Sequence, residues 1–221
     1  MPAYNEGKNI SEVIARTKKV IPNILVVDDG SSDDTYKKSI SAGVSVIKHT
    51  LNMGKGEALR SAFKKIIADM PHVKYAVVID ADMQYSPEES IRFLDVLRND
   101  KADFVMGYRD FSKVPFRHKM GNFMWRNVFN LMFGTKLRDA NCGFIALSRR
   151  AVSAVVEKIH GGYIIEDSML AECVRRKFII EQVPVSVSYA RLSGVFRGIR
   201  VVAGVLVFIL TEGLRYRLRF S

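Results

Sequence analysis

The chain has 221 residues, of which 48% are hydrophobic, which is enough apolar material for one globular domain with a proper core. Its 34 lysines and arginines against 23 aspartates and glutamates give a net charge of +11, which indicates an anionic partner: nucleic acid, a phosphorylated substrate or an anionic lipid. The cysteines, Cys142 and Cys173, match neither a metal-binding spacing nor a disulfide framework, so they indicate a reducing compartment. No secretory signal precedes the first motif.

The first half of the chain alternates short apolar runs with segments of helical apolar spacing. The predicted strands are residues 24–27, 44–47, 75–79 and 103–106, and the predicted helices are residues 10–20, 33–42, 56–70 and 87–98. The last helix opens on Ser86-Pro87-Glu88-Glu89, with a cap candidate, a proline for the first turn and acids after it. This alternation predicts an α/β fold with a mostly parallel central sheet and helices on both faces.

After Arg109 the pattern changes, and the strands become less regular. Helices are predicted at 117–133, 149–159 and 166–175, and strands at 143–147 and 178–187, the second interrupted by Pro184. Neither a repeat nor a low-complexity linker divides the chain. We therefore expect one domain over residues 1–190, followed by a basic, apolar segment over residues 191–221.

The most informative stretch is Asp80-Ala81-Asp82-Met83-Gln84, directly after the predicted strand 75–79. Residues two apart on an extended segment point to the same side, so both carboxylates reach the rim of a sheet together. They repel each other unless a cation lies between them, and a hard divalent ion shared with substrate phosphates is the usual solution. The stretch predicts a metal-assisted enzyme that handles a nucleoside diphosphate, and the alternative is a solvated turn.

The segment Asp28-Asp29-Gly30-Ser31-Ser32-Asp33-Asp34-Thr35 also follows a predicted strand. The carboxylates of Asp28 and Asp29 can accept hydrogen bonds from a base or a ribose, and Ser31 or Ser32 can cap the next helix. An acidic turn with a helix cap would give the same pattern without any ligand. The position at a strand end favours the ligand interpretation, because open α/β sheets bind ligands beyond the carboxyl ends of their strands.

The segment Asn52-Met53-Gly54-Lys55-Gly56 precedes a predicted helix. Glycines let the backbone approach a ligand, and a helix N-terminus with a lysine favours phosphate, so Gly54 and Lys55 are candidate diphosphate-binding residues. The segment lacks the spacing of a Walker loop, and the glycine pattern of dinucleotide oxidoreductases is absent from the sequence. Arg109, in Gly107-Tyr108-Arg109, lies at another strand end and joins this candidate site.

Taken together, five motifs resemble, in order and spacing, those of the family 2 glycosyltransferases of GT-A fold, over roughly residues 2–185. They are Pro2-Ala3-Tyr4-Asn5-Glu6 and the four segments that contain Asp28, Gly54, Asp80 and Arg109. The resemblance implies that the base and ribose of a nucleotide sugar bind to Pro2, Ala3, Tyr4, Glu6 and Asp28. It implies that Mg²⁺ or Mn²⁺ at the diphosphate binds to Asp80, Asp82 and Gln84. It also implies a hydrophobic strand before the first motif, so we expect the true start to lie upstream of Met1.

A narrower resemblance is to the dolichyl- and polyprenyl-phosphate sugar synthases. It is carried by Asp82-Met83-Gln84 with Ser86-Pro87-Glu88, by Asp139-Ala140-Asn141-Cys142-Gly143-Phe144, and by Arg191-Leu192-Ser193-Gly194. It implies inverting transfer of a sugar from UDP-glucose or GDP-mannose to a lipid phosphate. Such an acceptor is already ionised, so arginines must position it, and the candidates are Arg117, Arg138 and Arg191.

The alternative acceptor is a sugar hydroxyl of a glycan or polysaccharide, which needs a carboxylate base. Glu166-Asp167 resembles the acidic pair that many family 2 enzymes use for this, which makes Asp167 the candidate base, with Asp139 as a second candidate and Asp82 as the third catalytic carboxylate. An acidic first turn that stabilises a helix N-terminus would also explain the pair.

The C-terminal segment contains the apolar run 201–210, bounded by Arg200 and Glu212. About 20 residues are needed to cross a bilayer, so the run predicts an interfacial amphipathic helix, or alternatively a core helix. Arginines beside it suit a lipid phosphate, which predicts a peripheral protein at the cytoplasmic face of a membrane. Nucleic acid is disfavoured as the partner, because acids crowd the proposed ligand-binding rim.

Overall fold

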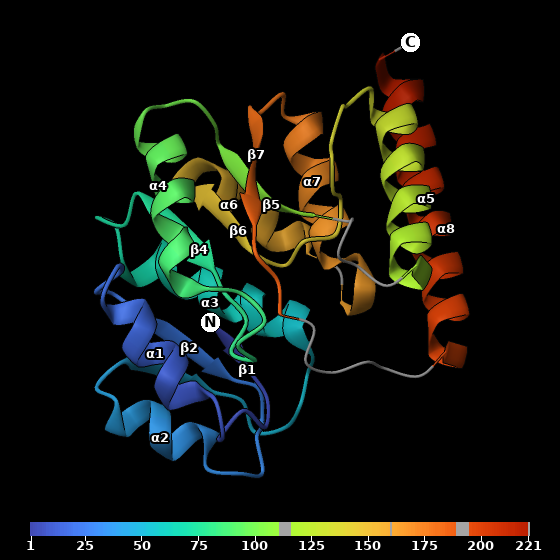
Figure 1. Cartoon of the computed structure of the whole chain (residues 1–221). Helices are drawn as coiled ribbons and strands as arrows, with labels where there is room; N and C mark the ends of the chain where they lie inside the picture. The colour runs from blue at the N-terminus through green and yellow to red at the C-terminus, as the bar shows by residue number, and fades with distance from the viewer. Residues whose placement is uncertain (111–115, 160, 189–194, 221) are drawn as a thin grey trace.

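The computed structural model describes residues 1–110, 116–159, 161–188 and 195–220 (Figure 1). The strands are β1 (Pro2–Ala3), β2 (Leu25–Asp28), β3 (Ser45–Lys48), β4 (Tyr75–Val78), β5 (Phe104–Arg109), β6 (Ile145–Ser148) and β7 (Ile180–Val185). The α-helices are α1 (Ile10–Lys18), α2 (Thr35–Ser41), α3 (Lys55–Asp69), α4 (Ser90–Arg98), α5 (Phe116–Phe133), α6 (Arg149–Val155), α7 (Ile165–Arg175) and α8 (Val195–Phe220). Short 3₁₀ turns, η1 (Pro87–Glu89), η3 (Val156–Lys158) and η4 (Gly162–Ile164), complete the described elements.

The strands form two sheets rather than one continuous sheet. Strands β1, β2 and β3 form a parallel sheet, and a second sheet has the order β4-β6-β5-β7. Among the described strands only β6 runs antiparallel to its neighbours, β4 and β5. The prediction of a mostly parallel α/β fold is confirmed, and the sequence pattern missed β1, whose two residues pair with Val27 and Asp28.

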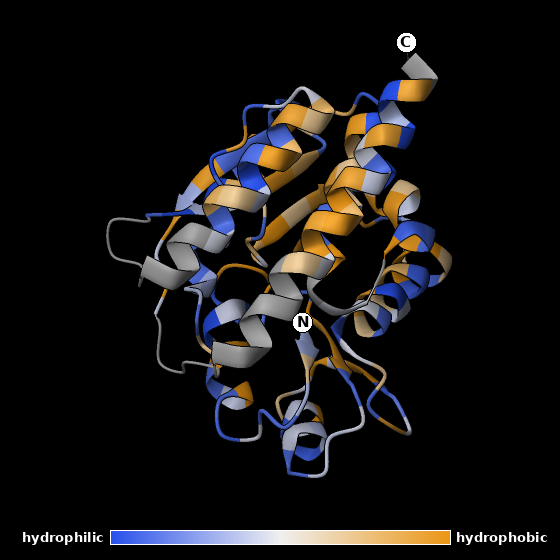
Figure 2. Cartoon of the chain, turned by 90° about the vertical axis from the view of Figure 1, so that its right-hand side faces the viewer, coloured by the Kyte–Doolittle hydropathy of each residue, from blue (hydrophilic) through white to orange (hydrophobic). Residues whose placement is uncertain are grey.

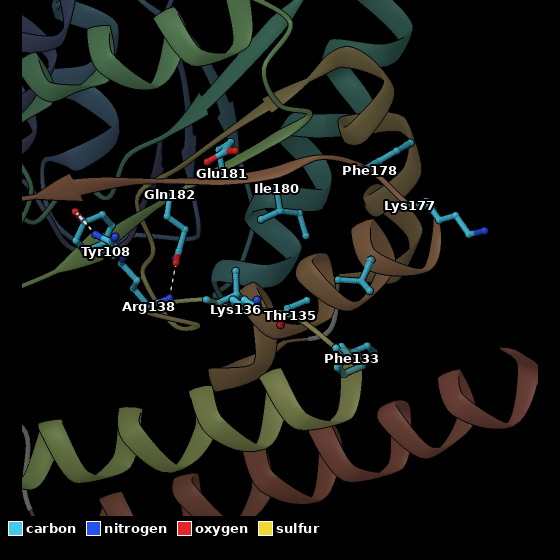
Figure 3. Close-up of a pocket in the computed structure, with 13 residues that line it drawn as sticks. Tyr108, Phe133, Thr135, Lys136, Arg138, Lys177, Phe178, Ile180, Glu181 and Gln182 are labelled. Carbon is cyan, nitrogen blue, oxygen red and sulfur yellow. Dashed lines mark hydrogen bonds between the residues drawn. The ribbon is translucent and has the colours of Figure 1, made fainter. Parts of the chain in front are cut away.

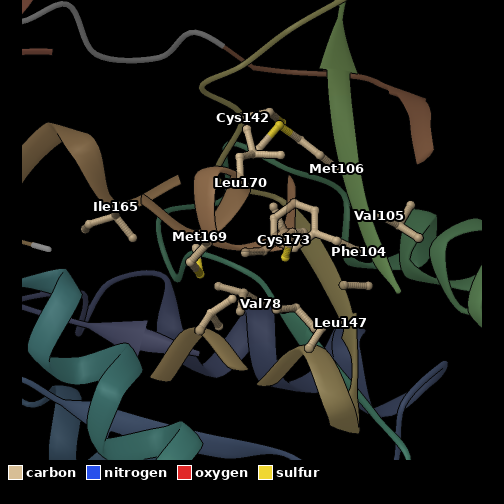
Figure 4. Packing of buried hydrophobic residues seen from close by; sticks show 14 of the residues in the cluster. Val78, Phe104, Val105, Met106, Cys142, Leu147, Ile165, Met169, Leu170 and Cys173 are labelled. Atoms are coloured by element: carbon tan, nitrogen blue, oxygen red, sulfur yellow. The ribbon is translucent and has the colours of Figure 1, made fainter. Parts of the chain in front are cut away.

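Helices cover both faces of the second sheet. Met106 and Ile145 are partners across β5 and β6, so they share one face, and Phe144 points to the other. On the Phe144 face, Phe93 of α4 stacks on that ring with centroids 4.4 Å apart. On the Met106 face, α7 contributes residues to the same buried cluster (Figure 4). The main hydrophobic core therefore lies on both sides of this sheet.

Strand β7 forms the edge of the second sheet and contains Pro184. Proline lacks a backbone N–H and is tolerated where a strand has only one hydrogen-bonded neighbour. The predicted interruption at Pro184 is therefore absent, because β7 pairs with β5 on one side only.

Helix α8 is much longer than the apolar run 201–210, because it continues through Glu212 and the arginines beyond it. The Glu212 carboxylate pairs with Arg175 of α7 and, at 2.7 Å, with Arg215. Along its length α8 packs against α5, with Gly213 against the side chain of Met132 (Figures 1 and 2). One side of α8 is buried at Val205, Ile209 and Gly213, and the opposite side exposes Val207, Leu210, Leu214 and Leu218.

Of the helices in the described ranges, none combines the length and hydropathy that crossing a membrane requires.

Candidate functional site

The candidate site lies at the carboxyl ends of β2 and β4, where the sequence predicted it. Asp28 is the last residue of β2, and Asp80 follows β4 by two residues. Arg16 links α1 to the turn that follows Asp82. Its guanidinium donates hydrogen bonds to both Glu88 carboxylate oxygens, at 2.9 and 2.7 Å. Ser86 occupies the predicted N-cap position, of the 3₁₀ turn η1, but its hydroxyl donates to the Glu88 carboxylate and makes no cap hydrogen bond.

The Asp28 carboxylate has a buried oxygen that can accept a further hydrogen bond. Its Oδ1 accepts a hydrogen bond from the Ser31 N–H at 3.3 Å, and its Oδ2 is buried without a partner in the described residues. Asn5, at φ 55°, donates its N–H to Ser31 Oγ, and its Oδ1 accepts from the Ser32 N–H, both at 2.9 Å. These contacts hold the first two motifs together around an unsatisfied oxygen, which suits a hydroxyl or N–H donor from a ligand.

The rest of the first motif lines the same corner. Pro2 and Ala3 are buried in β1, whereas Tyr4 is 48% exposed and Glu6 is partly exposed. One Glu6 carboxylate oxygen accepts from Asn9 Nδ2 at 2.8 Å. Ser31 and Ser32 do not cap the next helix, because α2 begins later, at Thr35, whose N–H donates to Asp33 Oδ1.

Asp29 holds the loop before α3 in place, and its predicted contact with a ligand stays a prediction. Its carboxylate accepts the N–H groups of Met53 at 3.0 Å and Gly54 at 2.7 Å, and its Oδ1 lies 2.7 Å from His49 Nδ1. Gly54 has φ 92°, a conformation that favours glycine. Both Asp29 oxygens therefore fix the loop that leads to Lys55, the first residue of α3.

Lys55 lies between two carboxylates from distant parts of the chain. Its ammonium is 2.9 Å from each Asp80 carboxylate oxygen and 3.4 Å from Glu166 Oε1. A Cβ added at Gly143 would meet all three groups, at 2.9 Å from Lys55 Nζ, 3.0 Å from Asp80 Oδ2 and 3.4 Å from Glu166 Oε1. In the sequence Gly143 belongs to a recognised motif but has no predicted role. The contact between Lys55 and Glu166 was not predicted.

Asp82 and Gln84 complete the acidic turn. Asp82 Oδ1 accepts from the Gln84 N–H at 3.0 Å, across Met83, which has φ 64°. Burial raises the pKa of the Asp82 carboxyl, and the negative charge of Asp80 adds to the rise, so a cation at this point would be stabilised.

The pair Asp80 and Asp82 fits a divalent ion of the kind that shares its ligands with phosphates. Within the described ranges, no three His, Cys, Asp or Glu side chains form a complete cation cage. Mg²⁺ is commonly held by one or two carboxylates plus substrate phosphates and water, so two carboxylates are a sufficient protein contribution. The Gln84 side chain has no hydrogen-bond partner among the described residues and could add an oxygen ligand.

Asp139 and Arg109 are paired with each other. Arg109 Nε and Nη2 donate to the two Asp139 oxygens at 2.7 and 3.0 Å, and Asp139 is fully buried. Arg109 Nη2 also donates to the Asn141 carbonyl at 3.0 Å. The pair therefore fixes the segment that leads to Gly143, and the predicted catalytic role of Asp139 and nucleotide-binding role of Arg109 stay predictions.

Asp167 is buried on α7, and neither carboxylate oxygen has a hydrogen-bond partner in the described residues. Burial raises its pKa well above the ordinary value, and the charges of Glu166 and Asp139 add to this effect. Asp167 is therefore a buried carboxyl group, adjacent to Glu166 in the chain, that favours its protonated form.

Of the three arginines predicted to bind the acceptor phosphate, Arg138 is the one with a described side chain, and that side chain lies away from the Asp80 turn. Arg138 lies in a groove of about 570 Å³ at the β7 edge, where its guanidinium donates to the Tyr108 hydroxyl at 2.9 Å (Figure 3). Strand β7 is three strand spacings from β4, or about 14 Å. Arg191 lies outside the described residues, and Arg117 lies on α5 with a side chain outside them.

Comparisons with known proteins agree with this geometry. Residues 1–156 match the model of the protein family described as "Glycosyl transferase family 2". The UDP-N-acetylglucosamine–dolichyl-phosphate N-acetylglucosaminyltransferase of Methanococcus voltae is 30% identical, over 94% of this chain and 91% of the relative. The dolichol-phosphate mannosyltransferase of Pyrococcus furiosus is 31% identical, over 70% of this chain and 47% of the relative.

A solved structure gives the same fold. It is glucosyl-3-phosphoglycerate synthase from Mycobacterium tuberculosis in complex with Mn²⁺, UDP and phosphoglyceric acid, with a TM-score of 0.77 and 20% identity over 96% of this chain and 76% of that one. This likeness confirms the predicted GT-A fold. The family match covers most of the chain and includes the strand ends that carry Asp28 and Asp80, so the chain belongs to glycosyl transferase family 2 and is a glycosyltransferase.

Proposed function

We propose that this enzyme transfers a sugar, with inversion, from a nucleoside diphosphate sugar to a polyprenyl or dolichyl phosphate, and that it needs a divalent metal ion. The observation that carries the proposal is the convergence of Asp80, Asp82 and Lys55 after β4, together with the unsatisfied oxygen of Asp28 at the end of β2. Two carboxylates and an ammonium suit a metal-bound diphosphate, and a free buried acceptor suits its ribose or base.

The donor half follows from this arrangement. Asp28 accepts a hydrogen bond from the nucleoside, and Pro2, Ala3, Tyr4 and Glu6 enclose it. Asp80, Asp82 and Gln84 would hold Mg²⁺ or Mn²⁺, which when bound neutralises the charge that develops on the leaving diphosphate. A relative is named for UDP-N-acetylglucosamine, and the similar solved structure is a complex with UDP, so UDP sugars are the first donors to test, beside the GDP-mannose that the sequence also permits.

The acceptor half rests on the relatives and on Asp167. Two relatives named above are transferases of dolichyl or dolichol phosphate. An ionised phosphate acceptor needs no base, and a buried Asp167 whose pKa is raised is poorly suited to act as one without rearrangement. Both points support the lipid phosphate.

We also propose that the enzyme binds the cytoplasmic face of a membrane peripherally, through α8 and α5. The exposed side of α8 presents Val207, Leu210, Leu214 and Leu218, and the neighbouring α5 exposes Phe123, Met124 and Leu131. Figure 2 shows hydrophobic residues along both helices. Exposed apolar residues on two adjacent helices, with arginines near the ends of α8, suit the boundary between head groups and acyl chains. A protein bound there would meet a lipid phosphate directly.

A hydroxyl acceptor is the second candidate, and one observation favours it. Asp167 has two buried oxygens without partners, and such groups concentrate at functional sites. Asp167→Asn separates the alternatives: a fall in rate of about 10²–10⁴-fold indicates a hydroxyl acceptor, and a mild effect indicates a phosphate.

The proposal is tested by sugar transfer with the purified protein. UDP-N-acetylglucosamine, UDP-glucose and GDP-mannose are offered separately with Mn²⁺ or with EDTA, and with or without polyprenyl phosphate. We expect label in a lipid-extractable product only with metal and lipid phosphate, and only background with Asp80→Asn. Asp95→Asn is the matched control, because Asp95 is exposed on α4. Donor hydrolysis or transfer to a glycan without any lipid product would contradict the lipid acceptor.

A further inference from the structure

Lys55 is the side chain that joins the donor half of the site to the acceptor half. Its ammonium contacts both oxygens of Asp80, which belongs to the acidic turn after β4, and Glu166, which opens α7 beside Asp167. The side chains are 29%, 22% and 10% exposed for Lys55, Asp80 and Glu166, so the contacts are largely shielded from water. Ion pairs in such surroundings are stronger than those at the surface.

On the side of Gly143, the packing around Lys55, Asp80 and Glu166 leaves little room for a second cation. Gly143 lies against all three charged groups, so closely that a single Cβ would fall within 3.0 Å of both Lys55 Nζ and Asp80 Oδ2. A divalent ion that binds Asp80 must therefore share the oxygens that Lys55 already contacts. Two cations on one carboxylate repel each other, so the bound ammonium weakens binding of the ion.

A nucleoside diphosphate changes this balance, because it brings negative charge to the same point. Lys55 is the first residue of α3, where the helix N-terminus already favours a phosphate. Its four-carbon stem is flexible, so the ammonium can move from a carboxylate to a phosphate oxygen without a change in the backbone.

We propose that Lys55 is an exchangeable counter-ion that makes the divalent metal and the nucleoside diphosphate bind cooperatively. Without ligands it neutralises Asp80 and ties Glu166 to the donor site. When the metal and the diphosphate bind together, it leaves both carboxylates and contacts the diphosphate, which also frees Glu166 next to Asp167. This inference rests on the proposed function, since it assumes a metal-dependent diphosphate donor.

Calorimetric titration tests the inference without measuring turnover. Mn²⁺ is titrated alone and in saturating UDP, for the natural protein, for Lys55→Gln, and for Lys65→Gln. Lys65 is a matched control, because it lies on the same helix and pairs with Asp69, at 2.9 Å, away from the site. Thermal melting of each variant confirms that it is folded.

In the natural protein we expect UDP to raise the Mn²⁺ affinity by at least about 10-fold, within the usual range of coupling between sites. In Lys55→Gln we expect Mn²⁺ alone to bind several-fold more tightly and the enhancement by UDP to fall toward one. Glu166→Gln, which weakens one of the two anchors, should shift Mn²⁺ affinity in the same direction by a smaller factor. Lys65→Gln should behave as the natural protein.

The outcomes separate this inference from the proposed function. If Mn²⁺ and UDP both bind and Lys55→Gln leaves their coupling unchanged, the counter-ion role is wrong and the proposed function stands. If UDP binds but Mn²⁺ does not bind with or without it, metal dependence fails and the counter-ion role fails with it. If Lys55→Gln weakens Mn²⁺ binding in the absence of UDP, Lys55 supports the metal site instead of competing with the ion, which also overturns the inference.

Discussion

The Arg109 guanidinium donates two hydrogen bonds to the buried Asp139 carboxylate, at 2.7 and 3.0 Å. The pair joins the end of β5 to the segment before β6. The Asp139 side chain is fully buried and that of Arg109 is 20% exposed. A further hydrogen bond, from the Asn141 N–H to Asp139 Oδ1 at 3.1 Å, extends the network toward Gly143. These contacts hold the segment that leads to Gly143, and Gly143 in turn lies against Lys55, Asp80 and Glu166.

Arg109→Leu should therefore act mainly on stability. It leaves the Asp139 carboxylate buried without its counter-charge, which lowers the free energy of unfolding by about 3–5 kcal/mol. Urea denaturation measures the change. Arg98→Leu is the control, because the Arg98–Asp95 pair is 3.9 Å apart and exposed, so its loss should change stability by less than about 1 kcal/mol. Loss of activity at unchanged stability would instead support the direct ligand role predicted for Arg109.

Local sequence predicts those site residues whose position is fixed by the end of a single strand. Asp28 and Asp80 follow apolar runs, and the end of a buried strand fixes where their carboxylates lie. For the same reason the order of the elements and the α/β fold follow from periodicity. The antiparallel direction of β6 does not, because an apolar run carries no information about which neighbour it pairs with.

The roles of Asp29, Arg109 and Asp139 could not be predicted because their partners are distant in the chain. Asp29 bonds N–H groups 24 and 25 residues away, and Arg109 bonds a carboxylate 30 residues away. In sequence, a carboxylate that holds a loop and one that binds a ligand look alike. The end of the C-terminal helix was misplaced for a similar reason, since the charge of Glu212 is compensated by Arg175 from α7.

A second structural prediction concerns Arg149, which binds the C-terminal end of α3. Its Nη1 donates to the carbonyls of Met70 at 2.8 Å and Val73 at 3.2 Å, and its Nη2 to that of Ile67 at 3.0 Å. A cation there satisfies free carbonyls and the helix dipole together. Arg149→Met keeps the apolar stem and should lower the free energy of unfolding by about 2 kcal/mol, measured by urea denaturation.

The matched comparison for Arg149 is Arg149→Lys. Lysine keeps the charge but cannot fork between several carbonyls, so it should recover only part of the lost stability. Full recovery would show that the charge alone matters at the end of α3. No change with methionine would show that the carbonyls are satisfied equally well by water.

Gly143→Ala should affect catalysis more than folding. The added Cβ would meet Lys55 Nζ, the far end of a flexible side chain, so the fold can adapt by moving the ammonium away from Asp80. Because small displacements of positioning groups are costly, we expect kcat/KM for sugar transfer to fall by about 10- to 100-fold with a nearly unchanged melting temperature. Gly204→Ala is the control, since a Cβ at Gly204 of α8 meets nothing within 4 Å. Equal activities of the two variants would show that the cluster tolerates a shift of Lys55.

Asp167 gives a prediction about pH. Its carboxyl has an ordinary pKa of about 3.9 in the unfolded chain. Burial raises the pKa of Asp167 well above this in the folded protein, and the charges of Glu166 and Asp139 raise it further. At a pH between the unfolded and the folded pKa, the unfolded chain releases a proton that the folded protein keeps. The contribution of Asp167 to stability is therefore fully present below the unfolded pKa and is lost as the pH rises toward the folded pKa.

Asp167→Asn should consequently melt at a higher temperature than the natural protein at pH 8, and the difference should shrink toward zero as the pH is lowered to 4. Asparagine is similar in shape to the protonated carboxyl but does not ionise, so it removes the loss of stability at high pH. Melting temperatures at intervals between pH 4 and pH 8 measure the effect, with the exposed Asp95→Asn as the control, for which we expect no such trend. A variant that melts below the natural protein at pH 8 would mean that the ionised Asp167 makes a stabilising contact, and the hydroxyl-acceptor alternative, which needs an ionised base at this position, would then gain support.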